Sequence, residues 1–217
     1  MKSDTTVKKG WFWLWLALGA MILGLGVIST VARLRGSFAE PLPVISPVAD
    51  FTLTNQDGAA VTLADLHGQV WLADIVFTRC AGPCPRMTRQ MKDFQQSLPN
   101  GSRTRLVTLT TDPGYDTPVI LKAYAAKFGA DRSRWQFLTG SKKEMAALAR
   151  DSLKLTALEQ APSDRQTPED LFIHSTIFVL VDKQARLRAC FETDGEGIDP
   201  ARVKERILAA IRQLERE

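Results

Sequence analysis

Cysteine and histidine are scarce in this chain, and their scarcity limits the kinds of site that it can build. The 217 residues include three cysteines and two histidines. Three cysteines are too few for a disulfide-stapled scaffold, and Cys80 and Cys84 would close a loop too small to hold a domain together. Cys190 lies in an apolar run, where a small buried core residue is expected. The cysteine chemistry of interest therefore lies at Cys80 and Cys84.

The body of the chain carries almost no net charge. The formal net charge is +4, but five basic and two acidic residues fall within positions 1–43, which leaves 23 basic and 22 acidic residues in 44–217. A near-neutral body with no basic stripe excludes nucleic acid as the partner. Internal repeats and low-complexity segments are absent as well. The length suits one domain of ordinary size with an appendage.

Charge is absent altogether from residues 11–32, WFWLWLALGAMILGLGVISTVA. These 22 residues are enough to cross a bilayer core, which takes about 20. A cleaved signal peptide usually has a shorter apolar stretch, so an uncleaved membrane anchor is the favoured prediction. The lysines of residues 1–10 place that end on the inner side and the body in the periplasm, or in the mitochondrial intermembrane space of a eukaryote. Residues 33–47, with several prolines, are expected to tether the anchor to a body spanning 48–217.

Strand-like and helix-like patterns alternate along the body. A hairpin is expected around Asp57 and Gly58, followed by a fully apolar strand at 70–77 and a helix that ends near Pro99. The remaining expected elements are strands at 104–110, 135–138, 175–181 and 186–191, helices at 118–128, from Ser141 and from Pro200, and a long exposed loop at 156–170. This order predicts a thioredoxin-like α/β/α sandwich with an N-terminal β-hairpin extension, preceded by one transmembrane helix.

Cys80 and Cys84 lie where the apolar strand turns into a helix, in the stretch FTRCAGPCPRM. A proline after the second cysteine suits the first turn of a helix, where its missing N–H costs nothing. Free N–H groups at a helix start favour thiolate over thiol, and the flanking Arg79 and Arg86 add positive charge. A four-residue offset places both sulfurs on one helix face, so they could close a disulfide or hold one metal ion.

The two histidines differ in setting. His67 lies in a polar turn and is expected to be solvated. His174 precedes the apolar strand 175–181, which should neighbour the cysteine-bearing strand in a thioredoxin-like fold. Two thiolates and one imidazole form a soft three-ligand set that favours copper, with zinc as the next candidate. A histidine bonded only to backbone is the alternative for His174.

These residues resemble the SCO/SenC family of copper proteins. The similar segments, in the order of that family, are FTRCAGPCPRM, TLTTDPGYDTPVILKAYAAKFG, WQFLTGSKKEM and IHSTIFVLVD, and they cover most of residues 50–215. The resemblance implies a membrane-anchored thioredoxin-like domain that binds copper, one ion per chain, through Cys80, Cys84 and His174. It also implies a role in assembling the dinuclear copper centre of cytochrome c oxidase subunit II, by delivering copper or by reducing the cysteines of that subunit.

Two positions depart from the pattern of the family. Ala81 follows the first cysteine in place of the usual proline, and Ile173 precedes the histidine in place of the usual aspartate. A carboxylate beside a ligating histidine fixes its tautomer and raises its basicity, so its loss would weaken copper binding or pass the role to Asp170 or Asp112. Asp112 and Asp116 otherwise suit turn and helix-start chemistry.

Two functions are open from these residues. A copper metallochaperone binds and transfers the metal without turnover, and replacing Cys80, Cys84 or His174 should destroy its site. A thiol-disulfide oxidoreductase would use Cys80 as the attacking sulfur and Cys84 as the resolving one, with a Cys80–Cys84 disulfide in the oxidised form. A peroxidase of the peroxiredoxin type is a weaker alternative, because the threonine three residues before a lone nucleophilic cysteine is missing. Met87 and Met91 are expected to pack in the core.

Overall fold

The computed structural model describes residues 41–155 and 176–217 together with residues 11, 15, 16 and 18–27, and it describes the backbone alone at 157–159 and 172–174. This chain divides into two compact units, Met1–Pro41 and Leu42–Glu217. The predicted inner-side segment, residues 1–10, lies outside the described residues, as do residues 28–40 of the anchor and tether.

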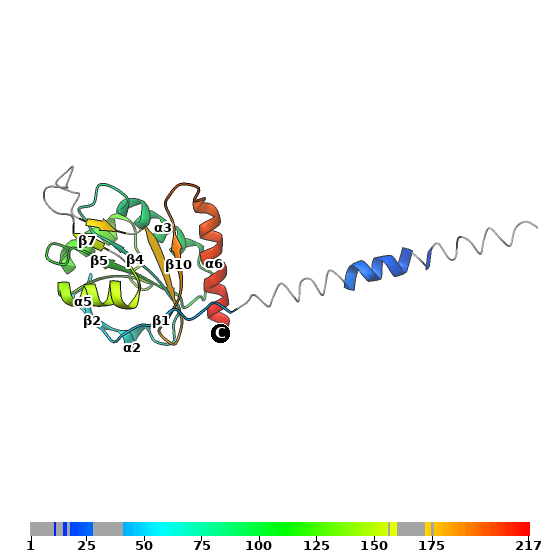
Figure 1. Ribbon diagram of the computed structural model, residues 1–217, viewed down its shortest axis with the longest axis horizontal. Helices are drawn as coiled ribbons and strands as arrows, with labels where there is room; N and C mark the ends of the chain where they lie inside the picture. The colour runs from blue at the N-terminus through cyan, green and yellow to red at the C-terminus, as the bar shows by residue number, and fades with distance from the viewer. Residues whose placement is uncertain are drawn as a thin grey trace, which may run out of the picture. The chain divides into compact units, whose positions relative to one another are not determined.

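In the first unit, the described residues of the predicted anchor are helical (Figure 1). Their large apolar side chains are exposed. The other residues of the 11–32 stretch lie outside the described chain. Within the part of the chain that the structure describes, no helix is both long enough and apolar enough to cross a membrane. The transmembrane helix stays a prediction.

The second unit is built around an eight-stranded sheet with helices on both faces (Figure 1). Its strands are β1 (Ser46–Pro47), β2 (Thr52–Asn55), β3 (Ala60–Thr62), β4 (Trp71–Val76), β5 (Arg105–Thr110), β6 (Trp135–Thr139), β9 (Ile177–Val181) and β10 (Arg186–Glu192). Its helices are α2 (Leu63–Leu66), α3 (Cys84–Ser97), α4 (Pro118–Lys127), α5 (Lys142–Ala146), the π-helical η1 (Ala147–Ser152) and α6 (Pro200–Arg216). The expected strands and helices follow one another in the expected order, with β1 and α2 as additional elements that were not expected.

The strands lie in the order β1-β10-β9-β4-β5-β6-β2-β3. β4, β5 and β6 run parallel, and β9 and β10 on one side and β2 and β3 on the other add antiparallel pairs. Every residue of β4 is buried, because helices cover both faces of this central strand. Alternate residues of β4 therefore face opposite cores, with Trp71 and Ile75 in one and Leu72 in the other.

The two cores belong to different helices. α3, α4 and α6 cover one face of the sheet, where Met87 and Met91 of α3 are buried with Phe178 of β9. α2, α5 and η1 cover the other face, where Met145 packs with Ile75. The prediction that Met87 and Met91 are core residues is confirmed.

The predicted hairpin forms between β2 and β3. Leu53 pairs with Val61, and Gly58 in the turn has a φ of +80°, a left-handed conformation that favours glycine. β2 also pairs with β6, so the hairpin extends the sheet beyond its parallel strands.

The segment before β9 differs from the expectation. β9 begins at Ile177 rather than at residue 175, and His174 ends a separate strand, β8 (Phe172–His174). β8 pairs antiparallel with β7 (Ala157–Glu159), which lies in the segment expected to be a loop. Strands of three residues are too short to leave a periodic pattern in a sequence, and no Asp-Gly or Asn-Gly pair lies between β7 and β8 in the sequence as one does between β2 and β3, so this strand pair was not predictable from the chain.

Cys190 is exposed, and the prediction of a buried core residue is wrong. β10 shifts its register between Leu187 and Ala189, so Leu187 packs in one core and Phe191 in the other. Such a bulge reverses which residues face each side of the sheet, and Cys190 then lies on the face opposite Phe191. An apolar run in the sequence shows neither the bulge nor the face.

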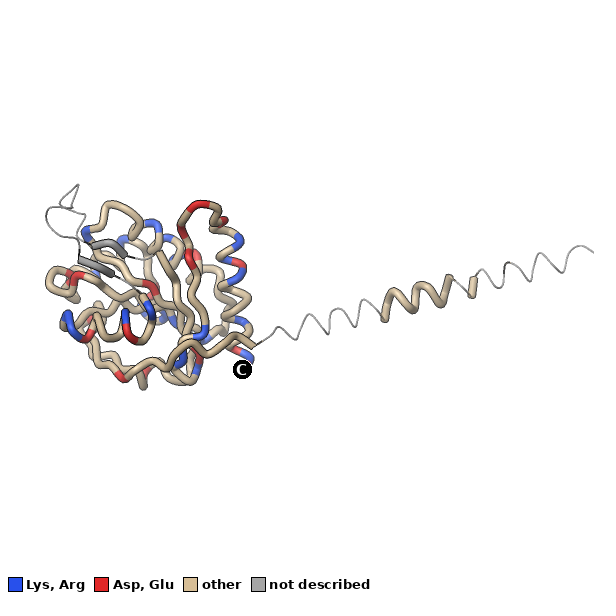
Figure 2. Tube along the Cα trace, viewed as in Figure 1, with Lys and Arg blue, Asp and Glu red and all other residues tan. Residues whose placement is uncertain are grey.

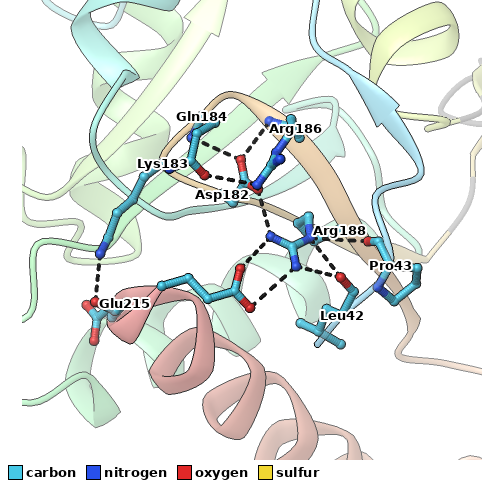
Figure 3. Close-up of polar contacts among 9 residues, drawn as sticks. Leu42, Pro43, Asp182, Lys183, Gln184, Arg186, Arg188 and Glu215 are labelled. Carbon is cyan, nitrogen blue, oxygen red and sulfur yellow. Dashed lines mark hydrogen bonds and ion pairs between the residues drawn. The ribbon is translucent and has the colours of Figure 1, made fainter. Parts of the chain in front are cut away.

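Arg188 of β10 joins the two ends of the second unit (Figure 3). Its side chain is 3% exposed, and its guanidinium donates hydrogen bonds to the carbonyl of Leu42, to Asp182 at 2.8 Å and to Glu217 at 2.7 Å. β1 also pairs with β10. The compact unit therefore begins at Leu42, and residues 42–47 of the expected tether pack on the body.

Basic and acidic residues are interspersed along the second unit (Figure 2). This distribution agrees with the near-neutral charge of the body.

Candidate metal centre

The two cysteines lie at the carboxyl end of β4, where the chain turns into α3. Cys84 is the first residue of α3 and Pro85 the second. The N–H of Cys80 donates to the carbonyl of Phe77 at 3.2 Å, and the N–H of Phe77 donates to the Sγ of Cys84 at 3.5 Å. The side chains of Cys80 and Cys84 are hydrogen-bonded to each other. The turn thus brings both sulfurs to one point.

The two sulfurs differ in exposure. Cys84 is fully buried, whereas Cys80 is half-buried. Burial raises the pKa of the Cys84 thiol, and the hydrogen bond with Cys80 raises it further. The expectation that the helix start and the flanking arginines would favour a thiolate is therefore wrong for Cys84. Both arginines form ion pairs with carboxylates, which compensates their charge near the sulfurs.

A buried carboxylate, Asp116, holds the start of the cysteine turn. Asp116 accepts hydrogen bonds from the N–H of Thr78, at 3.2 Å, and from the hydroxyls of Thr78 and Thr110. Burial outweighs these hydrogen bonds and raises the pKa of Asp116. Helix-start chemistry is not its role, because Thr117 is the N-cap of α4. Since Thr110 ends β5, the contact ties the cysteine turn to the neighbouring strand.

Arg79, directly before Cys80, forms the second contact with the β5–α4 loop. Its guanidinium pairs with Asp112 and lies over the ring of Tyr115, 4.0 Å from the ring centroid. The Asp112 carboxylate is therefore paired with Arg79. The described contacts give no support to the expectation that Asp112 is the carboxylate beside His174.

Buried polar side chains lie beneath the turn. The Thr88 hydroxyl donates to the carbonyl of Cys84 at 2.9 Å and lies 2.9 Å from the Tyr124 hydroxyl. Asp74, fully buried within β4, accepts a hydrogen bond of 2.6 Å from Thr108. Sequence analysis missed these residues. Asp74 left a visible signal, a single charge inside the apolar strand VWLADIVF, whereas a threonine in a helix leaves none.

His174 is described through its backbone alone, which pairs with Ala157 of β7, and its side chain lies outside the described part of the chain. Asp170 lies outside it altogether. His67, expected to be solvated, is exposed. Among the side chains that the structure describes, no three His, Cys, Asp or Glu residues form a group that could hold a metal ion. The three-ligand site stays a prediction, of which the structure describes the two sulfurs, a soft donor pair suited to copper.

Comparison with known proteins places this arrangement in a family. Residues 43–212 match the family model SCO1/SenC. The chain belongs to the SCO1/SenC family. A relative, the SCO1 protein homolog of Bacillus subtilis, is 38% identical over 147 residues, which are 67% of this chain and 73% of that protein.

Solved structures of Sco proteins share the fold. BsSco, described as a member of the Sco family of cytochrome c oxidase assembly proteins, is 30% identical, with a TM-score of 0.66 over 81% of this chain and 98% of that chain. ScoI of Arabidopsis thaliana, solved with copper bound, is 23% identical, with a TM-score of 0.60 over 77% of this chain and 99% of that chain. The predicted thioredoxin-like α/β fold of the body is confirmed.

Proposed function

We propose that this SCO1/SenC protein is a copper metallochaperone that binds one copper ion per chain through Cys80, Cys84 and His174. The observation that carries the proposal is the cysteine turn, where a half-buried and a buried sulfur contact each other at the end of β4. The contacts of Thr78 with Asp116 and of Arg79 with Asp112 hold that turn in place. The copper-bound relative supports the choice of metal.

Copper loading exchanges protons for the metal. Thiolate and imidazole are the ligands that soft copper prefers, and each sulfur must lose its proton before it binds. Burial raises the pKa of the Cys84 thiol, so its proton is harder to remove than that of an exposed thiol. Half-buried Cys80 is the sulfur that an incoming ion meets first. Copper affinity should therefore rise with pH as both thiols ionise.

The proposed client is subunit II of cytochrome c oxidase, whose dinuclear copper site would receive the copper or have its cysteines reduced. The assignment of BsSco to cytochrome c oxidase assembly supports this client. Residues 11–32 would anchor the chain in a membrane by a single pass. The body would then face the periplasm, or the intermembrane space of a mitochondrion, with residues 1–10 on the inner side.

A thiol-disulfide oxidoreductase is the second candidate, and the unequal exposure of the two sulfurs favours it. The Cys80 thiolate would attack one sulfur of a client disulfide. This step forms a mixed disulfide between Cys80 and the client and releases the other client sulfur as a thiol. Cys84 would then attack Cys80, which releases the second client thiol and leaves a Cys80–Cys84 disulfide. The same disulfide removes both sulfur ligands, so oxidation would also unload copper.

Anaerobic titration of the full chain with Cu(I) and with Cu(II) tests the metallochaperone. The expected result is one copper per chain and, with Cu(II), a thiolate-to-copper charge-transfer absorption. Cys80→Ser, Cys84→Ser and His174→Ala should each abolish that absorption. Cys190→Ser is the matched control, because its thiol is exposed on β10 and outside the site.

A client peptide disulfide assay separates the two candidates. If the protein is a metallochaperone, the His174→Ala variant should lose tight copper binding. If it is an oxidoreductase alone, the His174→Ala variant should keep full reductase activity, and the wild type should bind copper no better than the Cys80→Ser variant. Full copper stoichiometry in the disulfide form would contradict the proposed unloading by oxidation.

A further inference from the structure

A chain of polar contacts links the helix that begins at Cys84 to the segment that follows His174. Arg86, two residues after Cys84, forms an ion pair with Asp194, which lies 108 positions further along the chain. The carbonyl of Asp194 accepts a hydrogen bond of 3.4 Å from the hydroxyl of Thr176. The first turn of α3 and the start of β9 are thus joined through the loop after β10.

Thr193 completes this link. Its N–H and its hydroxyl both donate to the carbonyl of Thr176, each at 2.9 Å, and Thr193 is buried. Thr176 follows His174 by two residues, so the Cα atoms of these two residues lie within about 7 Å of each other. The contacts among Arg86, Thr176, Thr193 and Asp194, here called the Arg86 strap, therefore restrict the backbone beside the predicted third ligand.

We infer that the Arg86 strap positions His174 against Cys80 and Cys84 and so sets the copper affinity of the site. The inference rests on the proposed function. The ligands come from two elements far apart in the sequence, and a metal site is strong only where the supporting contacts hold its ligands in place before the metal arrives. Arg86 and Asp194 are positioning residues.

The strap has a competing explanation with an opposite sign. Arg86 lies near the sulfurs, and its charge alone would favour thiolates. Were that its only role, Asp194→Asn would release Arg86 from its ion pair, favour the thiolates and tighten copper binding. Positioning predicts the reverse, because the same substitution detaches Arg86 from the loop whose backbone holds Thr176. The two explanations therefore differ in the direction of the change at Asp194.

The test measures the Cu(I) dissociation constant of the full chain by competition with a chelator. Arg86→Gln and Asp194→Asn should each weaken binding about two- to fivefold, as expected for an exposed ion pair. The reversed pair, Arg86→Asp with Asp194→Arg, should restore the affinity. Arg132→Gln is the matched control, because Arg132 is also an exposed arginine in an ion pair, with Asp57 of the hairpin turn. Arg132→Gln should leave the copper affinity unchanged. Its thermal midpoint should shift no more than the midpoints of the two strap variants.

A His174→Ala background shows whether the strap acts through the imidazole. In that background, Arg86→Gln and Asp194→Asn should have no further effect on the copper affinity. Wild-type affinity in Arg86→Gln, tighter binding in Asp194→Asn, or an undiminished strap effect in the His174→Ala background would each overturn the inference while the metallochaperone stands. Wild-type affinity in His174→Ala itself would overturn the proposed ligand set and the strap with it.

Discussion

Asp116 and Asp182 are both buried carboxylates next to strand ends, and they are neutralised in different ways. Asp182 lies beside two guanidinium groups, those of Arg186 and Arg188. Burial alone would raise its pKa, but these hydrogen bonds outweigh burial and lower it. The hydrogen-bond donors to Asp116 are the hydroxyls of Thr78 and Thr110 and one backbone N–H, and burial prevails and raises its pKa.

The difference separates scaffold from site. Around Asp182, cationic side chains close the cluster and tie the first and last residues of the folded unit to β10 (Figure 3). Around Asp116, neutral donors hold the cysteine turn without placing a further cation beside the two sulfurs of the proposed copper site. The buried carboxylate of Asp182 is thus held by cations, whereas the buried carboxylate beneath the cysteine turn is held by neutral donors, with the ion pairs of Arg79 and Arg86 lying further out at half-exposed positions.

The largest expected effect comes from removing Arg188. Arg188→Met should lower the free energy of unfolding by about 3–5 kcal/mol, because Asp182 loses its buried partner. Urea unfolding measures this loss. Arg186→Met is the matched control, since Arg186 contacts the same carboxylate but is 38% exposed, and it should cost less than about 1 kcal/mol. Equal losses of unfolding free energy in the two variants would contradict the distinction between the buried Arg188 and the more exposed Arg186.

A smaller effect is expected at Asp116. Asp116→Ala should cost about 1–3 kcal/mol, because the buried N–H and hydroxyl groups of Thr78 and Thr110 lose their acceptor, and copper binding should weaken as the turn loosens. Asp116→Asn should cost less, because it keeps an acceptor oxygen and burial already favours a neutral group there. Urea unfolding and copper titration on each variant check both statements. An Ala variant as stable and as tight for copper as the wild type would remove Asp116 from the site.

The smallest effect is a difference in pH dependence. The folded-state pKa of Asp116 lies above its ordinary value, so the wild type should gain stability relative to Asp116→Asn as pH falls through that pKa, until the unfolded chain is protonated near 3.8. The pKa of Asp182 is lowered, so the stability it contributes is present above the ordinary value and is lost as pH falls through the folded-state pKa. As pH falls, the difference in the free energy of unfolding between the wild type and Asp116→Asn should rise, and the difference between the wild type and Asp182→Asn should fall. Urea unfolding of the three proteins across acidic pH measures both differences. Parallel curves would contradict the comparison.

Much of the fold could be predicted because its strands and helices follow simple patterns. The apolar run that became β4, the turn at Asp57 and Gly58 and the helix start at Cys84 each carry a local signal. The short β7–β8 pair carries none, because three residues make no period and no Asp-Gly pair lies between the two strands in the sequence. Cys190 was misplaced because the bulge in β10 depends on tertiary packing rather than on the run itself.

The site was predictable in its sulfurs but not in its supports. Cys84 begins α3 and Cys80 lies in the turn before it, which the strand-to-helix pattern and Pro85 indicate. Asp116 and Thr78 meet from positions 38 residues apart, and both suit ordinary turns, so nothing in the chain announces their contact. The acidity of Cys84 was misjudged for the same reason. Burial and the pairing of its flanking arginines are tertiary properties that outweigh the local effect of a helix start.

X-ray absorption at the copper edge of the full chain loaded with one Cu(I) tests the central claim most directly. The account predicts two sulfur ligands and one imidazole nitrogen in the wild type, and loss of the nitrogen in His174→Ala with both sulfurs retained. A wild-type spectrum with two sulfurs alone, unchanged by His174→Ala, would contradict it.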